Sequence, residues 1–313
     1  MNARRHREPR RVLRPLLVAV ALLVFAAHAL PAQRISRTMD SLSREVDAAR
    51  RRNNDTLVVV IMSEMTRTLW GTYPDSAMAL AQRTLALAES IQYRRGIGVA
   101  YNNIAYIHRK QSRNQECLDY SKKAVEILES LGDVETAAWC YHNMGNVYST
   151  RGRYDLALEN HFKALRLREV LNNARLMAWS LSNIADIYRE QGYKEQSLEY
   201  TLRAIPLFQR SDDRHGMAVA LNSVGLIFQD REEYDSAMAY FTRALTLDEE
   251  SEHGTGIIWS ARYCGELSLL RGRFAEALQY FERSLVWSRH TNDRKNEAIS
   301  LLLVAKTFRA QGD

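Results

Sequence analysis

The sequence predicts an all-α chain, built as a solenoid of six helical hairpins followed by one further helix. Three observations lead to this fold class. A pattern of small residues recurs every 40 positions, apolar residues within each repeat fall on one helical face, and only two of the five prolines, Pro74 and Pro206, lie beyond residue 31. Proline interrupts helices, so this distribution favours helices over a turn-rich β architecture.

The first 32 residues have the layout of a secretory signal peptide. Arginines between Arg4 and Arg14 precede an unbroken apolar run, Leu16–Ala27, and small residues follow it. Cleavage is expected after Ala29 or Ala32, which would place the mature chain in the bacterial periplasm or outside the cell. The alternative is an uncleaved anchor that holds the chain at the membrane facing the periplasm, although the run is shorter than the ~20 residues that span a bilayer.

The positive charge of the chain is concentrated in this leader. The net charge is +6, but residues 1–33 hold six arginines and one acid, so only +1 remains for the rest. A nearly neutral surface does not provide the phosphate contacts that drive binding to DNA or RNA, and we expect no nucleic-acid partner.

Residues 33–55 are expected to form a leading helix, and residues 56–313 form the repeat array. One column of small residues recurs without slippage, and a second lies twelve positions after it. The first column holds Ala105, Gly145, Ala185, Gly225, Gly265 and Ala305, and the second holds Cys117, Ala157, Ser197, Ala237 and Ala277. The repeats are expected at 56–95, 96–135, 136–175, 176–215, 216–255 and 256–295, with an incomplete unit at 296–313.

Each unit is expected to contain two amphipathic helices. In the third unit the first helix is predicted over 136–150 and the second over 154–171, because apolar residues follow the helical period in both. Gly152 separates them, and glycines recur at 192, 272 and 312, where a left-handed residue can end a helix. Pro206 falls inside a second helix and is expected to kink or shorten it.

The three cysteines favour a packing role. No Cys-x-x-Cys pair is present. Cys117 occupies a column of small residues on a predicted apolar face. Cys140 and Cys264 lie on first helices, and neither has another cysteine at the same level to pair with. We expect all three to be buried, unreactive thiols.

These columns resemble the tetratricopeptide repeat in a 40-residue form. The stretch 141–146 with Gly152, Tyr154 and Ala157 looks like repeats of peptide-binding scaffolds such as kinesin light chains. The whole layout, with Asp40, Ser41 and Leu42 in the leading helix, is similar to periplasmic sensor regions of bacterial histidine kinases and LuxR-type regulators. The resemblance implies a right-handed α-α superhelix whose first helices line a concave groove.

Each first helix carries one stripe of apolar residues for the core and a second stripe offset from it by two residues. The resemblance places ligand contacts on this second stripe. That stripe carries tryptophans, amides and charges at repeating positions. The candidate peptide-binding residues are Asn102, Asn103, Trp139, Asn143, Asn146, Trp179, Asn183, Asp186, Arg189, Asn222, Trp259 and Arg262.

Two roles remain open for these residues. An asparagine amide both donates and accepts, so a ladder of such amides can pair with a peptide backbone of any sequence, and tryptophans can anchor apolar side chains. Alternatively, the asparagines bridge adjacent helices and the tryptophans pack between repeats.

No catalytic or metal-binding arrangement is evident along the chain. The histidines show no metal-ligand spacing, and Gly96 and Gly98 lack the strand and the third glycine of a nucleotide-binding loop. We therefore expect a non-catalytic scaffold without a cofactor that binds a protein or peptide segment. The alternative is the sensor portion of a longer signalling protein with a histidine kinase, cyclase or LuxR-type output, because residues 311–313 match the turn between two helices of a unit. Such an effector could be membrane-anchored.

Overall fold

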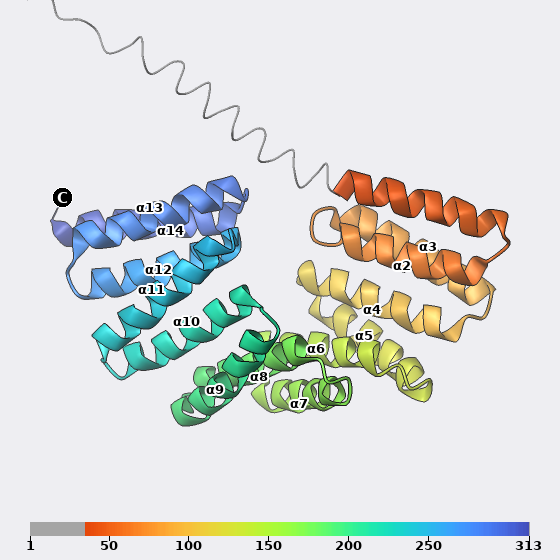
Figure 1. Ribbon diagram of the computed structural model, residues 1–313, viewed down its shortest axis with the longest axis horizontal. Helices are drawn as coiled ribbons and strands as arrows, with labels where there is room; N and C mark the ends of the chain where they lie inside the picture. The colour runs from red at the N-terminus through yellow and green to blue at the C-terminus, as the bar shows by residue number, and fades with distance from the viewer. Residues whose placement is uncertain (1–34, 313) are drawn as a thin grey trace, which may run out of the picture.

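The computed structural model describes residues 35–312, and this part of the chain consists of helices and turns without strands (Figure 1). A leading helix spans residues 35–51, within the segment predicted for it. Six helical hairpins and one last helix follow, as the 40-residue period predicts. The predicted signal peptide lies outside the described residues. Within residues 35–312, no helix is long and apolar enough to cross a bilayer.

The two helices of each unit alternate along the chain. The first helices are α2 (Asp55–Leu69), α4 (Arg94–Lys110), α6 (Val134–Thr150), α8 (Ala174–Glu190), α10 (Arg214–Asp230), α12 (Gly254–Leu270) and the last helix α14 (Arg294–Gln311). The second helices are α3 (Pro74–Ser90), α5 (Asn114–Ser130), α7 (Tyr154–Val170), α9 (Lys194–Arg210), α11 (Tyr234–Glu250) and α13 (Phe274–His290).

The turns between helices use left-handed residues, as predicted. Gly152, Gly192 and Gly272 have φ angles of 68°, 83° and 71°, which cost glycine little because it lacks a Cβ atom. Aspartate or asparagine begins several first helices, and Asp133 Oδ1, for example, accepts a hydrogen bond from the backbone N–H of Thr136 at 3.1 Å. These local signals set the length of each helix.

Small residues allow the two helices of a unit to approach closely. Ala105 and Cys117, one from each column of small residues, are both fully buried in one apolar cluster. Gly145 lies directly against the ring of His161, where an added Cβ atom would be 2.7 Å from Nε2. The three cysteines are buried and free, which confirms their packing role.

Of the two effects predicted for Pro206, a kink or a shorter helix, the shortening is wrong. Helix α9 runs through Pro206 and keeps 17 residues, the same length as α7. Proline removes one backbone hydrogen bond, and the packing of the helix against α8 and α10 is sufficient to continue it past Pro206.

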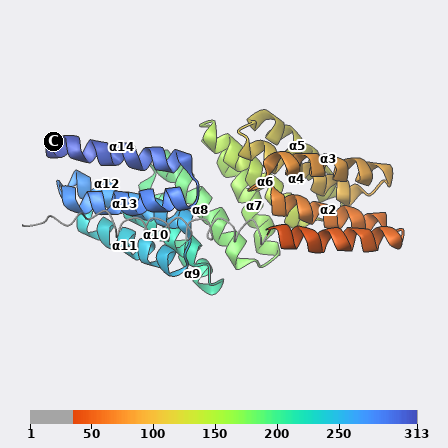
Figure 2. The same ribbon diagram turned by 90° about the horizontal axis from the view of Figure 1, so that it is seen from above.

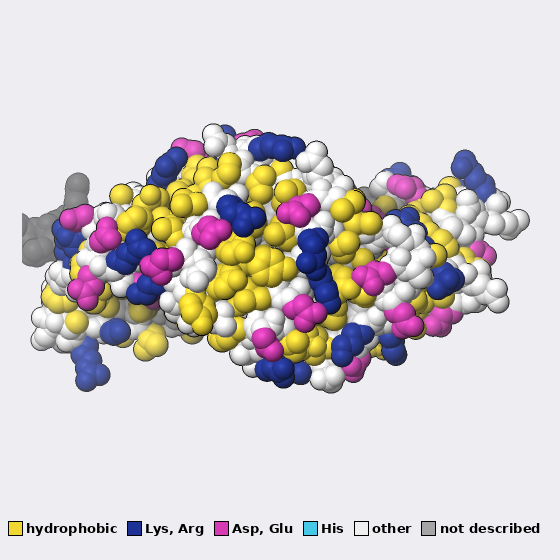
Figure 3. Space-filling view, turned by 90° about the horizontal axis from the view of Figure 1, so that it is seen from below, with side chains coloured by type: hydrophobic (Ala, Val, Ile, Leu, Met, Phe, Trp, Pro, Cys, Tyr) yellow, Lys and Arg dark blue, Asp and Glu magenta, His cyan; other side chains and the backbone are white. Residues whose placement is uncertain are grey.

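The array forms an arc with the leading helix at one end and α13 and α14 at the other (Figure 1). The backbones of consecutive first helices lie close together along most of the described chain. Those of α6 and α8 are farther apart, and Asn183 Nδ2 lies 3.5 Å from His142 Nδ1 between them. The two halves of the array meet at this point (Figure 2). The face opposite to the one seen in Figure 2 shows apolar side chains interspersed with charged ones (Figure 3).

Candidate functional site

Two adjoining cavities lie along the face formed by the first helices. The N-terminal cavity, of about 600 Å³, is lined by α2, α4 and α6, and the central cavity, of about 470 Å³, is lined by α4, α6, α7 and α8. Arg109, Trp139 and His142 line both cavities, so the two form one groove. The predicted placement of first helices along the groove agrees with this lining.

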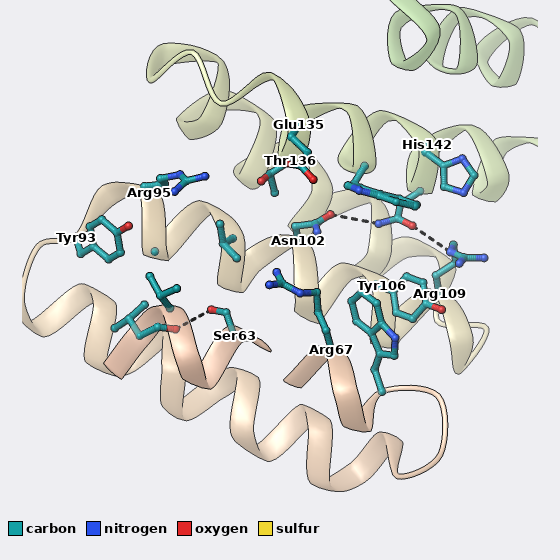
Figure 4. A pocket seen from close by; sticks show the side chains of 17 residues that line it. Ser63, Arg67, Tyr93, Arg95, Asn102, Tyr106, Arg109, Glu135, Thr136 and His142 are labelled. Carbon is teal, nitrogen blue, oxygen red and sulfur yellow. Dashed lines mark hydrogen bonds between the residues drawn. The ribbon is translucent and has the colours of Figure 1, made fainter. Parts of the chain in front are cut away.

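Aromatic and arginine side chains form one wall of the N-terminal cavity. The rings of Trp70 and Tyr106 stack with centroids 3.9 Å apart, and the guanidinium carbon of Arg109 lies 5.0 Å from the centre of the Tyr106 ring. Arg67 and Arg95 reach toward the same space from α2 and α4 (Figure 4). The wall therefore offers flat apolar surfaces beside cationic groups.

Asparagines join the first helices at the floor of this cavity, which Asn102 and Asn143 line and Asn103 does not. Asn143 Nδ2 donates to Asn102 Oδ1 at 3.3 Å, and Arg109 Nε donates to Asn143 Oδ1 at 3.2 Å (Figure 4). Asn103 Nδ2 donates to the backbone carbonyl of Ser63 at 3.4 Å. Asn103 and Asn143 are each only 1% exposed. These amides bridge neighbouring helices, and direct contact between them and a ligand remains a prediction.

The central cavity brings together four of the predicted residues. Trp139 and Asn146 reach it from α6, and Trp179 and Asn183 reach it from α8. The Nδ2 atom of Asn183 donates to the backbone carbonyl of Trp179 at 2.8 Å. The other residues that line this cavity are Arg109, His142, Arg168, Arg175 and Leu176.

Arg168 reaches the central cavity from a second helix, α7, at the place where α6 and α8 separate. Its side chain is 1% exposed, and its guanidinium carbon lies 5.0 Å from the centre of the Trp139 ring. Nη1 donates to Ser180 Oγ at 2.6 Å and to the backbone carbonyl of Leu176 at 3.2 Å. Burial lowers the pKa of Arg168 to about 10, so the group stays charged at neutral pH.

Two histidines lie beside this guanidinium and are held neutral. Burial lowers the pKa of His161 to about 3, with the charge of Arg168 adding to the effect. Burial also lowers the pKa of His142 well below its ordinary value, and Arg168, His161 and Arg109 act in the same direction. The positive charge in this region therefore belongs to the arginines.

The remaining predicted site residues lie on the C-terminal half of the array. Trp259 is 38% exposed, and the guanidinium carbon of Arg262 lies 3.8 Å from the centre of its ring. Asp186 and Arg189 form an ion pair at 4.0 Å, and Asn222 Nδ2 donates to Ser260 Oγ at 2.8 Å. These residues do not line either of the two cavities.

One cluster has the residue types of a metal site. His215, Asp248 and His253 bring ligand atoms within 4.8 Å of one another, although His215 is distant in the sequence from the other two. The two imidazole rings stack with centroids 3.6 Å apart and planes 18° apart, so their in-plane nitrogen lone pairs do not converge on one point. His253 Nδ1 already accepts from the backbone N–H of Gly256 at 3.0 Å. His253 acts here as the N-cap of α12, and His215 Nδ1 lies 3.1 Å from Asp248 Oδ1.

Sequence reasoning missed Arg109 and Arg168 as groove residues. The corresponding positions of two other units, 40 residues before and after Arg168, hold the fully buried Leu128 and Phe208. The same column holds a second buried charged residue, Asp248, 80 residues after Arg168, and charged residues in a column that is apolar in other units were the signal that could have identified it.

The comparisons with known proteins agree with this architecture. Residues 96–169 and 176–250 match the family model described as tetratricopeptide repeat. A search of curated proteins found no match.

Several solved structures share the fold at low sequence identity. The apo form of the quorum sensor NprR from B. thuringiensis has a TM-score of 0.63 at 15% identity, over 88% of this chain and 82% of that chain. A Rap protein complexed with competence and sporulation factor has a TM-score of 0.59 at 14% identity, over 88% of this chain and 86% of that one. A STAND protein with a tetratricopeptide repeat sensor from Pyrococcus horikoshii has a TM-score of 0.61 at 14% identity, over 89% of this chain and 45% of that chain.

Proposed function

The chain is built from tetratricopeptide repeats, and on that premise we propose that it is a non-catalytic scaffold that binds a peptide or protein segment in the groove of its first helices. The observation that carries the proposal is the pair of adjoining cavities, which extend across α2, α4, α6 and α8 and share Arg109, Trp139 and His142. An elongated groove lined by aromatic rings, amides and arginines suits an extended chain better than a compact small molecule.

The solved structures of similar fold support the same role. One of them is a Rap protein in complex with competence and sporulation factor, and another is a quorum sensor. At this level of identity the likeness supports the use of the fold as a binding scaffold, and the partner of this chain has to be found by experiment.

A random-peptide display library tests the proposal directly. Sequences enriched on the purified protein would be synthesised with a fluorescent label, and their affinities measured by anisotropy. Trp139→Val is the informative variant because Val99 and Val219 occupy the same repeat position. We expect it to keep its helical circular dichroism and to weaken peptide binding about tenfold or more, as loss of an aromatic anchor does.

Leu202→Ala provides the matched control, because Leu202 is 53% exposed on the second helix α9, away from both cavities. It should leave peptide affinity unchanged. Absence of any enriched sequence would contradict the proposal, as would equal binding by wild type and Trp139→Val.

We also propose that the array works outside the cytoplasm, on the support of the signal-like pattern in residues 1–32. A fusion of residues 1–40 to an alkaline phosphatase that is active only after export would test this. The wild-type leader should give activity, and Leu22→Arg, which interrupts the apolar run, should abolish it. Equal activity from both fusions would contradict export through this leader.

A second candidate function is the sensor portion of a longer signalling protein. It is favoured by the STAND relative, in which the matched part is 45% of the chain and the name assigns the repeats a sensor role. Sequencing the gene beyond codon 313 tests it. An apolar stretch of ~20 residues followed by an effector would support it, and an immediate stop codon would favour the independent scaffold.

A further inference from the structure

One first helix differs from the others in the side chain that caps it. The N-cap of α12 is His253, whose Nδ1 accepts from the backbone N–H of Gly256 at 3.0 Å. The other first helices that have a side-chain cap in the described chain use aspartate or asparagine, at Asn54, Asp133, Asn173, Asp213 and Asp293. An amide does not titrate and an aspartate titrates near pH ~4, whereas histidine changes its charge between about pH 5 and pH 8.

Only an unprotonated Nδ1 atom can cap α12. A protonated imidazole carries an N–H at both ring nitrogens and has no lone pair left to accept with. It would also place a positive charge at the positive end of the helix dipole. Protonation of His253 therefore replaces the hydrogen bond from Gly256 with a repulsive contact.

The first turn of α12 is intrinsically weak and relies on this cap. It contains Gly254 and Gly256, and no other first helix in the described chain has two glycines among its first three residues. Glycine loses more backbone entropy in a helix than any other residue. At Gly256 a better helix former does not fit, because an added Cβ atom would collide with the carboxylate of Asp248.

His253 is also stacked on a second titratable ring, that of His215 in α10. The ring centroids are 3.6 Å apart, so two protonated rings would repel each other. His215 Nδ1 lies 3.1 Å from Oδ1 of Asp248, a residue of α11 that is 1% exposed. Oδ2 of Asp248 accepts from Ser260 Oγ of α12 at 2.7 Å. The cluster thus joins the fifth unit to the sixth.

The surroundings of His253 disfavour its proton. Burial lowers the pKa of His253 and His215 acts in the same direction, while Asp248 and Asp213 partly oppose them. The folded chain therefore binds this proton more weakly than the unfolded chain does. The stabilisation from the cap is complete above about pH 6.5 and is lost as the pH falls below that value.

Other charged groups lie near this cluster on each neighbouring helix. Arg214 of α10 pairs with Glu250 of α11 at 3.7 Å, and Asp293 caps α14. From α13, Trp287 lies against the start of α12, and His290 packs on the edge of that ring with centroids 5.2 Å apart. A substitution of His253 alone leaves all of these groups in place, so a pH effect that it removes belongs to His253.

We propose that His253 is a pH-sensitive cap: when the pH falls from neutral to mildly acidic, its protonation releases the first turn of α12 and loosens the contact between the fifth and sixth units. The helices that begin with aspartate or asparagine keep their caps in this range. His215, Asp248, His253 and Ser260 line neither cavity, so this device is separate from the proposed peptide groove.

Amide hydrogen exchange of the whole protein, measured by mass spectrometry of peptic fragments at pH 7.5 and pH 5.5, tests the proposal. Rates would be corrected for the pH dependence of intrinsic exchange, and EDTA would exclude bound metal ions. We expect exchange at the start of α12 to rise about fivefold at pH 5.5, as loss of an N-cap predicts. The starts of α6 and α14, which Asp133 and Asp293 cap, should change little. An equal change at all three helices would overturn the proposal.

His253→Asn is the matched variant, because Asn173 caps α8 by accepting from the backbone N–H of Leu176 at 3.1 Å. It should protect the start of α12 as wild type does at pH 7.5 and show no additional exchange at pH 5.5. If this variant does not fold, His253→Asp, which copies Asp133, should give the same result. An acid-induced rise that persists in the folded variant would show that another group senses the pH, and the assignment to His253 would be wrong.

Discussion

The buried imidazole of His161 makes the stability of the array depend on pH, and one substitution should remove this dependence. In the folded chain burial lowers the pKa of His161 to about 3, whereas a histidine in an unfolded chain has a pKa of about 6.5. As the pH falls below about 6.5, the unfolded state therefore binds a proton that the folded state excludes. The free energy of unfolding should fall by about 2 kcal/mol from this group between pH 7 and pH 5, and continue to fall toward pH 3.

His161→Phe is the appropriate variant, because phenylalanine occupies the same position in another unit. Phe241 packs against Gly225 as His161 packs against Gly145, and it is completely buried. The variant should fold, and its aromatic ring should fill the same space without a titratable group.

Urea unfolding followed by far-ultraviolet circular dichroism, at pH 7 and at pH 5, measures the effect. The pH-dependent loss of stability should be smaller in the variant by about 2 kcal/mol. Other histidines and carboxylates titrate in both proteins, so their contributions cancel in this difference. An equal loss in both proteins would refute the reasoning and show that His161 is protonated without cost in the folded state.

Three further predictions concern packing and reactivity. Gly145→Ala should lower the free energy of unfolding by about 1–3 kcal/mol, measured by urea titration, because its Cβ atom would meet the His161 ring; unchanged stability would show that the ring can move aside. Asn143→Ala should cost about 1–3 kcal/mol in the same assay, because it removes the acceptor of Arg109 Nε and one of the donors to Asn102 Oδ1 below the groove; a neutral effect would argue for a ligand-contacting role instead. Cys140 and Cys264 should resist thiol reagents in the folded protein and react after denaturation, because burial raises the pKa of both, to about 12 for Cys264; rapid labelling of the folded protein would contradict this.

Much of the fold could be predicted from the sequence, because each unit repeats the same pattern of small and apolar residues and therefore forms the same pair of helices. The second helix expected over 154–171 is observed at Tyr154–Val170, and the first helix expected over 136–150 begins two residues earlier, at Val134. The earlier start follows from Asp133, whose carboxylate caps the helix. Periodicity locates a helix well, whereas its first turn depends on a cap that periodicity does not reveal.

The candidate site was less predictable, because it depends on contacts between units. Spacing groups Trp139, Asn143 and Asn146 on one helical face, the resemblance to the tetratricopeptide repeat assigned that face to the groove, and these residues do line the cavities. The hydrogen bonds that hold Asn143 beneath the surface could not be predicted, since they depend on how α4 and α6 are rotated. Arg168 was missed for a related reason: it belongs to a second helix, and it reaches the groove only where two first helices separate.

The sparse contact between α6 and α8 has a consequence for the mechanics of the whole rod. In a linear array, each unit is stabilised by its neighbours, so cooperativity passes along the chain through successive interfaces. At this junction the backbone contacts lie mainly between α7 and α8, with side-chain contacts from Phe162 to Tyr200 of α9 and from His142 to Asn183. Residues 55–170 and 174–311 should therefore melt and flex as two blocks, and a molecule bound in the central cavity would clamp one block to the other.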